Sequence, residues 1–157
     1  PNLYKEFEVH DHLDSRFDML CLHISLLMGR LRMLPEDVHK PLNQELFDRF
    51  FADMDFTLRE MGVGDLGVGK RVRKMSEAFM GRLLAYTKSL ERNDKMELAL
   101  VLARNIRRSH DCNETDRRMA DYVLESRDRL SAVSDNEIQA GKVDLVAILA
   151  LHGDSHG

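Results

Sequence analysis

The sequence predicts an all-α fold, a single irregular bundle of about six helices. Apolar residues recur every three or four positions along most of the chain, which is the period of an amphipathic helix. No segment shows the alternation of a half-buried strand, and no unit of about 20–50 residues repeats. No low-complexity linker divides the 157 residues, so we expect one domain over residues 1–157.

The first expected helix carries a continuous apolar stripe between Phe17 and Leu31. Its members are spaced by three or four residues: Phe17, Leu20, Cys21, Ile24, Leu27, Met28 and Leu31. Pro35 and Pro41 are then expected to bracket a connection, because proline interrupts helices. A second helix should follow, with its apolar face between Phe47 and Met61.

The third and fourth expected helices form the middle of the chain. The third has its apolar face between Val72 and Leu90. Asn93 and Asp94 offer a cap for the fourth, whose residues 96–102 are apolar almost all round. A helix without a polar face must be surrounded by other helices, so we expect this one to be central.

The last part of the chain carries weaker signals. Asn113 or Thr115 should begin a fifth helix, and Ser134 followed by Glu137 is the pattern of a capping box for a short sixth helix. From residue 141 the signal fades. We expect residues 141–157 to form a tail, in which residues 143–151 make a last helical turn or a strap over the bundle.

Composition and charge agree with a globular domain. The formal net charge is −4, so there is no overall basic field of the kind that gathers nucleic acid, DNA included, or an anionic membrane, and any such contact must be local. The two cysteines, Cys21 and Cys112, lie far apart in sequence, which favours a reducing compartment. No apolar run approaches the roughly 20 residues that span a bilayer.

A glycine-rich segment separates the second and third expected helices. Residues 64–70 match the first seven positions of a phosphate-binding loop, but Arg71 stands where that loop needs a hydroxyl residue. Such a loop also follows a buried strand, whereas the residues before this segment have helical periodicity. We therefore interpret it as a connection between helices, with glycines supplying unusual backbone conformations.

Four basic residues follow the glycines: Lys70, Arg71, Arg73 and Lys74. They should fall in the first turns of a helix, where the helix dipole favours acidic side chains instead. Something anionic should therefore face them. Carboxylates of the same hairpin, such as Asp53, Asp55 and Glu60, are one choice, and the other is an acidic partner segment, an RNA or lipid headgroups.

Two patterns carry a resemblance to a known family. One begins at Phe7-x-Val9-x-Asp11 and continues to Asp14-x-Arg16-Phe17-Asp18 and Leu22-His23. The other runs from Arg59-Glu60-Met61-Gly62-Val63-Gly64-Asp65 through Val68-Gly69-Lys70-Arg71-Val72 to Phe79-x-Gly81-Arg82 and Tyr86. Together they cover residues 4–107, and the chain resembles the ubiquinol–cytochrome c chaperones, which are assembly factors of respiratory complex III.

The resemblance implies a helical, non-enzymatic chaperone that binds newly made cytochrome b. Its expected partners further include a second assembly factor, the ribosome and the membrane surface. We expect a bacterial cytoplasmic location at the inner face of the cell membrane, or, as the alternative, the matrix side of the mitochondrial inner membrane. The segment that carries the resemblance supplies the expected interaction surface: Asp55, Arg59, Asp65, Gly69, Lys70 and Arg71, with Arg73 and Lys74 from the basic group.

The first helix has more apolar residues than one stripe needs. Leu13, Met19, Leu22, Leu26, Met33 and Leu34 lie off the stripe. Either this helix sits in the bundle centre with neighbours on two sides, or it forms a hydrophobic groove open to a client through Leu22 and Leu26. Nine methionines suit a groove, because their flexible side chains repack around varied apolar sequences.

Metal, cofactor and catalytic motifs are absent from the sequence. Cys21 and His23 are two apart on a helix and point to different sides. His10 with His12, and His152 with His156, lack the further ligands of a zinc site. We therefore expect no catalytic residue, no metal and no cofactor. The alternative function is a small RNA- or ribosome-associated module that uses residues 70–74 together with Arg104, Arg107 and Arg108.

Overall fold

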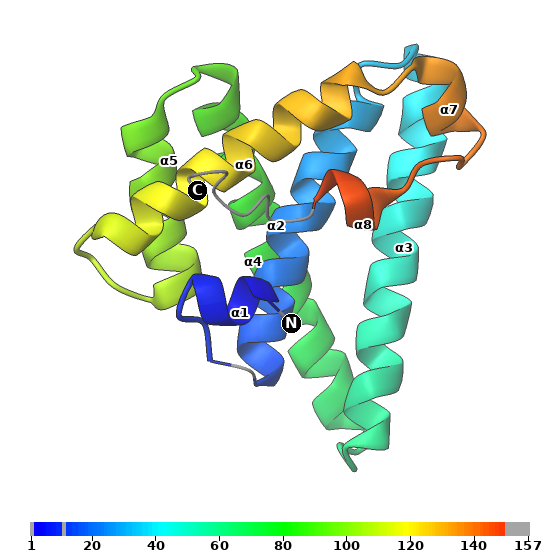
Figure 1. The fold of residues 1–157 in the computed structure, drawn as a ribbon. Helices are drawn as coiled ribbons and strands as arrows, with labels where there is room; N and C mark the ends of the chain where they lie inside the picture. The colour runs from blue at the N-terminus through cyan, green and yellow to red at the C-terminus, as the bar shows by residue number, and fades with distance from the viewer. Residues whose placement is uncertain (1, 11, 150–157) are drawn as a thin grey trace.

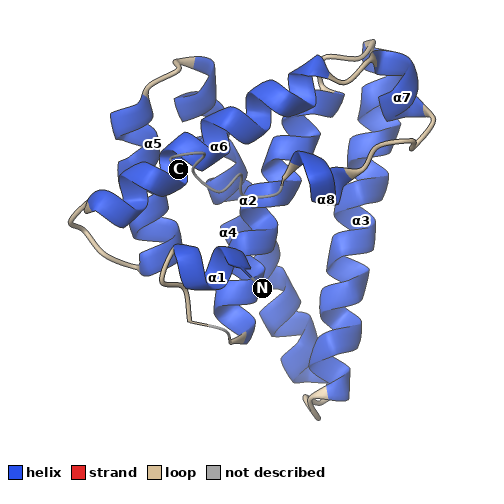
Figure 2. Cartoon of the chain, in the orientation of Figure 1, coloured by secondary structure: helices blue, strands red, loops and turns tan. Residues whose placement is uncertain are grey.

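The computed structural model describes residues 2–10 and 12–149, and all regular structure within them is helical (Figure 2). The α-helices are α1 (Asn2–Glu6), α2 (Leu13–Leu31), α3 (Glu36–Glu60), α4 (Asp65–Glu91), α5 (Lys95–Leu102), α6 (Glu114–Ala132), α7 (Asp135–Gln139) and α8 (Leu145–Ile148). A turn of π-helix, η1 (Ala103–Arg107), continues α5. The predicted all-α bundle is confirmed, and α1, η1 and α8 are short elements added to the six expected helices.

Figure 1 shows α2 crossing the middle of the molecule, with the other elements arranged around it. Helices α3 and α4 form a long antiparallel hairpin whose closed end projects beyond the rest of the chain. Helix α5 packs against α4 and α6, and α6 packs against α2. We call residues 61–64, at the closed end of the hairpin, the apex.

The main core lies where α2, α5 and α6 meet. Leu22, Leu98, Leu102 and Val123 are fully buried there. Leu98, Ala99 and Leu102 are buried, but Met96 and Leu100 of the same helix are exposed, so the expectation that this helix is surrounded on all sides is wrong. A second, aromatic core joins α2, α3 and α4 through Phe17, Phe50, Phe51 and Phe79.

Several helices end in the same reversal, with one residue in the left-handed conformation. At the end of α3 this residue is Gly62 (φ 85°), and the amides of Gly62 and Val63 donate to the carbonyls of Arg59 and Leu58. These are the two hydrogen bonds of a Schellman motif. The motif turns the chain sharply, so a connection of only four residues separates α3 from α4.

Two boundaries differ from the sequence prediction. Pro41 lies inside α3, which begins at Glu36 directly after Pro35. Proline in the second turn removes a single helical hydrogen bond, which a 25-residue helix tolerates. Helix α4 begins at Asp65, so Gly67 and Gly69 are helical and the connection is limited to the apex.

The early start of α4 also changes the argument from the helix dipole. Lys70 is the sixth residue of α4, so the four basic residues lie in its second and third turns. The dipole acts mainly within the first turn. There the charged residue is Asp65, which has the sign that the dipole favours. The expected conflict between the basic group and the dipole is therefore largely absent.

Candidate partner-binding site

One side of α4 faces away from the bundle along its whole length. Its residues step by three or four positions: Leu66, Lys70, Arg73, Glu77, Met80 and Leu84, all of them exposed. The opposite side, with Val68, Phe79 and Tyr86, is buried. We call the six exposed residues the α4 outer face. It combines three large apolar side chains with two basic ones on a helix about 40 Å long.

The basic residues of α4 gather around a shallow hollow. Lys70, Arg71, Arg73 and Lys74 line it together with Glu77. Arg73 approaches Glu77 at 3.6 Å, and both side chains are largely exposed. Within the described part of the chain, Lys70, Arg71 and Lys74 form no ion pair. The carboxylates of α3 therefore do not neutralise this group.

Three of the expected site residues bind each other beside the apex of the hairpin. Arg59 donates to Asp55 at 2.7 Å and also to Asp65, the first residue of α4. These hydrogen bonds raise the pKa of Arg59, with the bond to Asp55 contributing most. Arg59 and Asp65 are exposed and Asp55 is half-buried, so the three groups hold the start of α4 against the end of α3 at the surface.

Gly69 is exposed on α4 and is not required by the packing of the chain. A Cβ atom built at this position would have no neighbour within 4 Å. Its φ is not in the left-handed region either. Neither the backbone conformation nor the neighbouring atoms require glycine at this position. A glycine here is consistent with a surface that another molecule approaches closely.

The predicted client groove on the first helix is wrong. Leu22 is fully buried in the core, and the side chain of Leu26 is 3% exposed. Met19 and Leu34 are buried as well. Helix α2 has α3 and α4 on one side and α6 on the other, so the interpretation of a central helix with two packed sides is the one confirmed.

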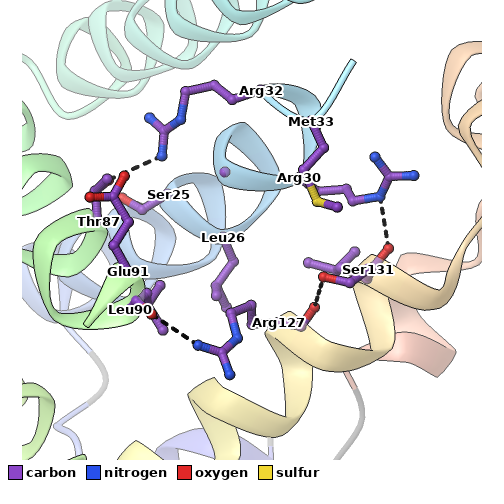
Figure 3. Close-up of a pocket in the computed structure, with 12 residues that line it drawn as sticks. Ser25, Leu26, Arg30, Arg32, Met33, Thr87, Leu90, Glu91, Arg127 and Ser131 are labelled. Atoms are coloured by element: carbon purple, nitrogen blue, oxygen red, sulfur yellow. Dashed lines mark hydrogen bonds between the residues drawn. The ribbon is translucent and has the colours of Figure 1, made fainter. Parts of the chain in front are cut away.

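Leu26 nevertheless contributes to a cavity of about 300 Å³ between α2, α4 and α6 (Figure 3). Leu26, Leu90 and Leu130 form its apolar wall. At its rim Arg32 donates to the Thr87 hydroxyl at 3.2 Å, and Arg127 donates to the Leu90 carbonyl at 3.0 Å. Met33, 61% exposed, lies beside the opening.

The cavity lies on the same side of α4 as the outer face. Thr87 and Glu91 line the cavity, and they follow Leu84 by three and seven residues, so the three side chains share one side of the helix. The basic hollow at one end of α4 and the cavity at the other are thus joined by Met80 and Leu84. Apolar exposed surface is present, but α4 supplies it in place of α2.

Comparison with known proteins identifies the family. The sequence matches the ubiquinol-cytochrome C chaperone family over residues 5–146. The chain belongs to this family. A crystal structure of the Cbp3 homolog from Brucella abortus superimposes with a TM-score of 0.78 at 39% sequence identity, covering 90% of this chain and 80% of that one. No curated protein matches the sequence significantly.

Several family motif residues form a buried charge cluster, which sequence reasoning did not find. The Asp18 carboxylate is 2.8 Å from Arg82 and 3.0 Å from Arg108. Burial raises the pKa of Asp18, while the two arginines act to lower it. The Arg82 guanidinium also lies 5.5 Å from the centre of the Phe17 ring. In this chaperone, therefore, the cluster joins α2, α4 and the end of η1 and serves the fold.

Two histidines of the chaperone, His12 and His23, form hydrogen bonds within the protein. His23 lies in α2, where Nδ1 donates to the Met19 carbonyl at 2.7 Å and Nε2 is 2.7 Å from the Tyr122 hydroxyl. His12 caps α2, accepting from the Ser15 amide at 3.3 Å. In the described ranges, no three side chains of the metal-binding types come together. His152 and His156 lie outside the described residues.

The arginines expected to extend an RNA surface are mostly engaged within the protein. Arg107 binds both oxygens of Asp116, at 2.8 and 2.5 Å, and Arg108 binds Asp18. Of the three, only Arg104 is exposed and forms no ion pair with a carboxylate among the described residues. No helix in the described part of the chain is long and apolar enough to cross a bilayer.

Proposed function

We propose that the protein is a non-catalytic chaperone that captures newly made cytochrome b during biogenesis of respiratory complex III. Its membership of the chaperone family supports the general role. The single observation that carries the proposal is the α4 outer face, where exposed apolar side chains lie beside Lys70, Arg71 and Lys74, which form no ion pairs among the described residues.

This surface suits an immature membrane protein as client. Before assembly, such a client exposes apolar helices joined by polar loops. Met80 and Leu84 offer apolar contact on α4, and Met33 extends it at the cavity. Methionine is flexible and polarizable, so it adapts to helices of differing sequence. The cations at the other end of α4 would hold acidic or polar loop residues of the client.

The expected site residues have distinct roles in this proposal. Lys70, Arg71, Arg73 and Lys74 contact the client directly, and Gly69 allows its close approach. Asp55, Arg59 and Asp65 hold the hairpin end in place through their ion pairs. Capture needs no cofactor, metal or catalytic residue. It would take place on the cytoplasmic face of a bacterial inner membrane, or on the matrix face in a mitochondrion, beside the ribosome or a second assembly factor.

The proposal is tested by recovering the tagged protein from its own cells and measuring how much cytochrome b accompanies it. Lys70→Glu combined with Arg71→Glu should reduce recovery at least about tenfold, because two attractive contacts become repulsive. Lys5→Glu combined with Lys142→Glu changes the net charge equally at exposed sites away from α4, and it should leave recovery unchanged.

Nuclease treatment and salt distinguish the RNA alternative. Apolar capture should survive nuclease and moderate salt, whereas contacts to RNA phosphates weaken steeply as salt rises. Loss of cytochrome b after nuclease, or equal recovery by the two double variants, would contradict the proposal.

A further inference from the structure

Three large apolar side chains around the apex of the α3–α4 hairpin are exposed, and only Leu66 among them also belongs to the α4 outer face. Phe56 near the end of α3 is 65% exposed, Met61 at its cap is 57% exposed, and Leu66 at the start of α4 is 86% exposed. All three lie within five residues of the apex. Helices α3 and α4 bury their inner sides, and these three exposed side chains belong to none of the core clusters of the described residues.

The shape of the molecule presents these side chains to a flat surface. The hairpin end projects beyond α1, α2 and α6, so nothing else in the bundle reaches as far (Figure 1). A projecting end can enter a layer to a shallow depth without bringing the remaining surface into contact. By contrast, a groove that wraps a protein segment is concave. The geometry therefore favours a broad surface over an enclosed ligand.

Charge placement identifies the surface as anionic. Along α4, Lys70 lies about 6 Å and Lys74 about 12 Å from Leu66, at 1.5 Å per residue. Apolar groups of peripheral proteins enter the headgroup region by about 5–10 Å, and lysine and arginine stems reach outward from there. With the apex side chains inserted, Lys70 and Arg71 would lie at the level of the lipid phosphates.

The acidic residues near the apex are largely compensated. Asp55 and Asp65 both bind Arg59. Glu60 is exposed and forms no ion pair in the described part of the chain, and Asp53 lies about two turns before the apex. Among the residues described, Glu60 is thus the unpaired acidic side chain closest to the inserted residues, and it would repel an anionic surface. Removing its charge should therefore increase the affinity for anionic vesicles, whereas removing the apolar side chains should decrease it.

We propose that the apex of the α3–α4 hairpin is a lipid-binding site: Phe56, Met61 and Leu66 insert into the headgroup region of an anionic membrane, and Lys70, Arg71 and Lys74 bind its phosphates. This site shares Leu66 and the basic residues with the client surface, whereas Phe56 and Met61 belong to the lipid-binding site alone. It would place the client surface upright against the membrane, where a membrane protein emerges.

The test uses the purified full chain with vesicles and no client, so its failure leaves client capture untouched. Sedimentation compares vesicles of phosphatidylcholine with vesicles that also contain phosphatidylglycerol. The wild-type chain should bind the anionic vesicles more tightly. The triple variant Phe56→Ser, Met61→Ser and Leu66→Ser should reduce that affinity at least about tenfold, because insertion of apolar side chains supplies much of the binding of peripheral proteins to membranes.

Matched variants distinguish insertion of the three apolar side chains from nonspecific hydrophobic adsorption and from electrostatic attraction. Met96→Ser changes a methionine of similar exposure, 54%, on α5 and away from the apex, and it should bind like wild type. Glu60→Gln should tighten binding by about fivefold, comparable with the effect of one cation near an anionic surface. Circular dichroism of each variant establishes that the fold is retained.

A fluorescent label measures insertion directly. In a chain carrying Cys112→Ser, which leaves only the buried Cys21, Met61→Cys accepts an environment-sensitive dye. Its emission should shift to shorter wavelength on anionic vesicles, and a dye attached through Met96→Cys should not respond. Absence of vesicle binding, equal binding of the triple variant and wild type, or a dye at residue 61 that stays in water would each overturn the proposal.

Discussion

His23 is a titratable side chain that joins α2 to α6 within the protein interior. Its ring lies between the Met19 carbonyl and the Tyr122 hydroxyl, and that hydroxyl is also 2.9 Å from the Leu149 carbonyl. Burial holds the pKa of His23 below its ordinary value of 6.5. The folded protein therefore binds fewer protons at this ring than the unfolded chain does between the two pKa values.

Stability should consequently fall as the pH drops below 6.5 toward the folded pKa of His23. Thermal unfolding between pH 8 and pH 5 measures this.

Asp18 acts in the opposite direction, because its raised pKa gives stability that is lost as the pH rises through its folded value. Comparing wild type with His23→Gln cancels the Asp18 contribution, and the variant should lose part of the decline. An unchanged decline would contradict the assignment to His23, while His110→Gln, at an exposed position, serves as the control.

Gly69 is the second residue with a specific prediction. Alanine is favoured over glycine in a helix by about 1 kcal/mol, and a Cβ atom fits here without contact. Gly69→Ala should therefore raise the melting temperature by about 2–4 °C. If a partner approaches this backbone closely, the same change should reduce recovery of cytochrome b. Gly81→Ala, also in open space on α4, controls for the effect on stability. A less stable Gly69→Ala chain would show that the helix is strained at this position.

Individual residues mark the boundary of what the sequence could predict for the site. The basic group of α4 is visible as a cluster, but Leu22 and Leu26 were assigned to a surface when α2 is packed on two sides. Periodicity does not show how many neighbours a helix has. The exposure of Met80 and Leu84 could have been predicted from the sequence. Helical periodicity assigns Phe79 and Leu83 to the buried side of the helix, and the residue that follows each of them lies outside that side.

At the scale of elements, local chemistry fixes several helix boundaries. Ser134 forms the capping box of α7, as its sequence pattern indicates, and Asn113, one of the two residues expected to begin the fifth helix, caps α6 through a box with Asp116. The start of α3 could not be predicted, because the tolerance of Pro41 depends on the length of helix beyond it. The π-helical turn η1 could not be predicted either, since it ends where Arg108 reaches the buried Asp18 carboxylate, more than 80 residues away in sequence.

The hairpin depends on the left-handed conformation of Gly62 (φ 85°). A side chain in this conformation costs roughly 1–2 kcal/mol, so Gly62→Ala should lower the melting temperature by several degrees. Nothing lies within 4 Å of the added Cβ atom, so the effect would come from the backbone alone. Calorimetry measures it. Gly64→Ala, also unobstructed but with φ −71°, should have a smaller effect, and equal effects would contradict the role assigned to Gly62.

At the scale of the whole molecule, the α4 outer face makes the client surface directional. The cavity beside Thr87 and the basic hollow beside Lys70 lie toward opposite ends of the same side of one helix. Helix α5, which carries exposed Met96, lies on another part of the bundle (Figure 1). A client held as we propose would therefore contact Leu84 on the α4 outer face and not Met96 on a different helix, although both side chains are exposed.

Photocrosslinking in cells measures this direction. A photoreactive amino acid in place of Leu84 should form a crosslink to cytochrome b while the client is being made, and the same group in place of Met96 should form none. Both positions are exposed, so neither replacement should disturb the core. Adding Lys70→Glu and Arg71→Glu to the Leu84 probe should abolish the crosslink if the cationic end and the apolar end hold one client together. A crosslink that persists would mean that the two ends act separately, and equal crosslinking from residues 84 and 96 would show that capture is not directional.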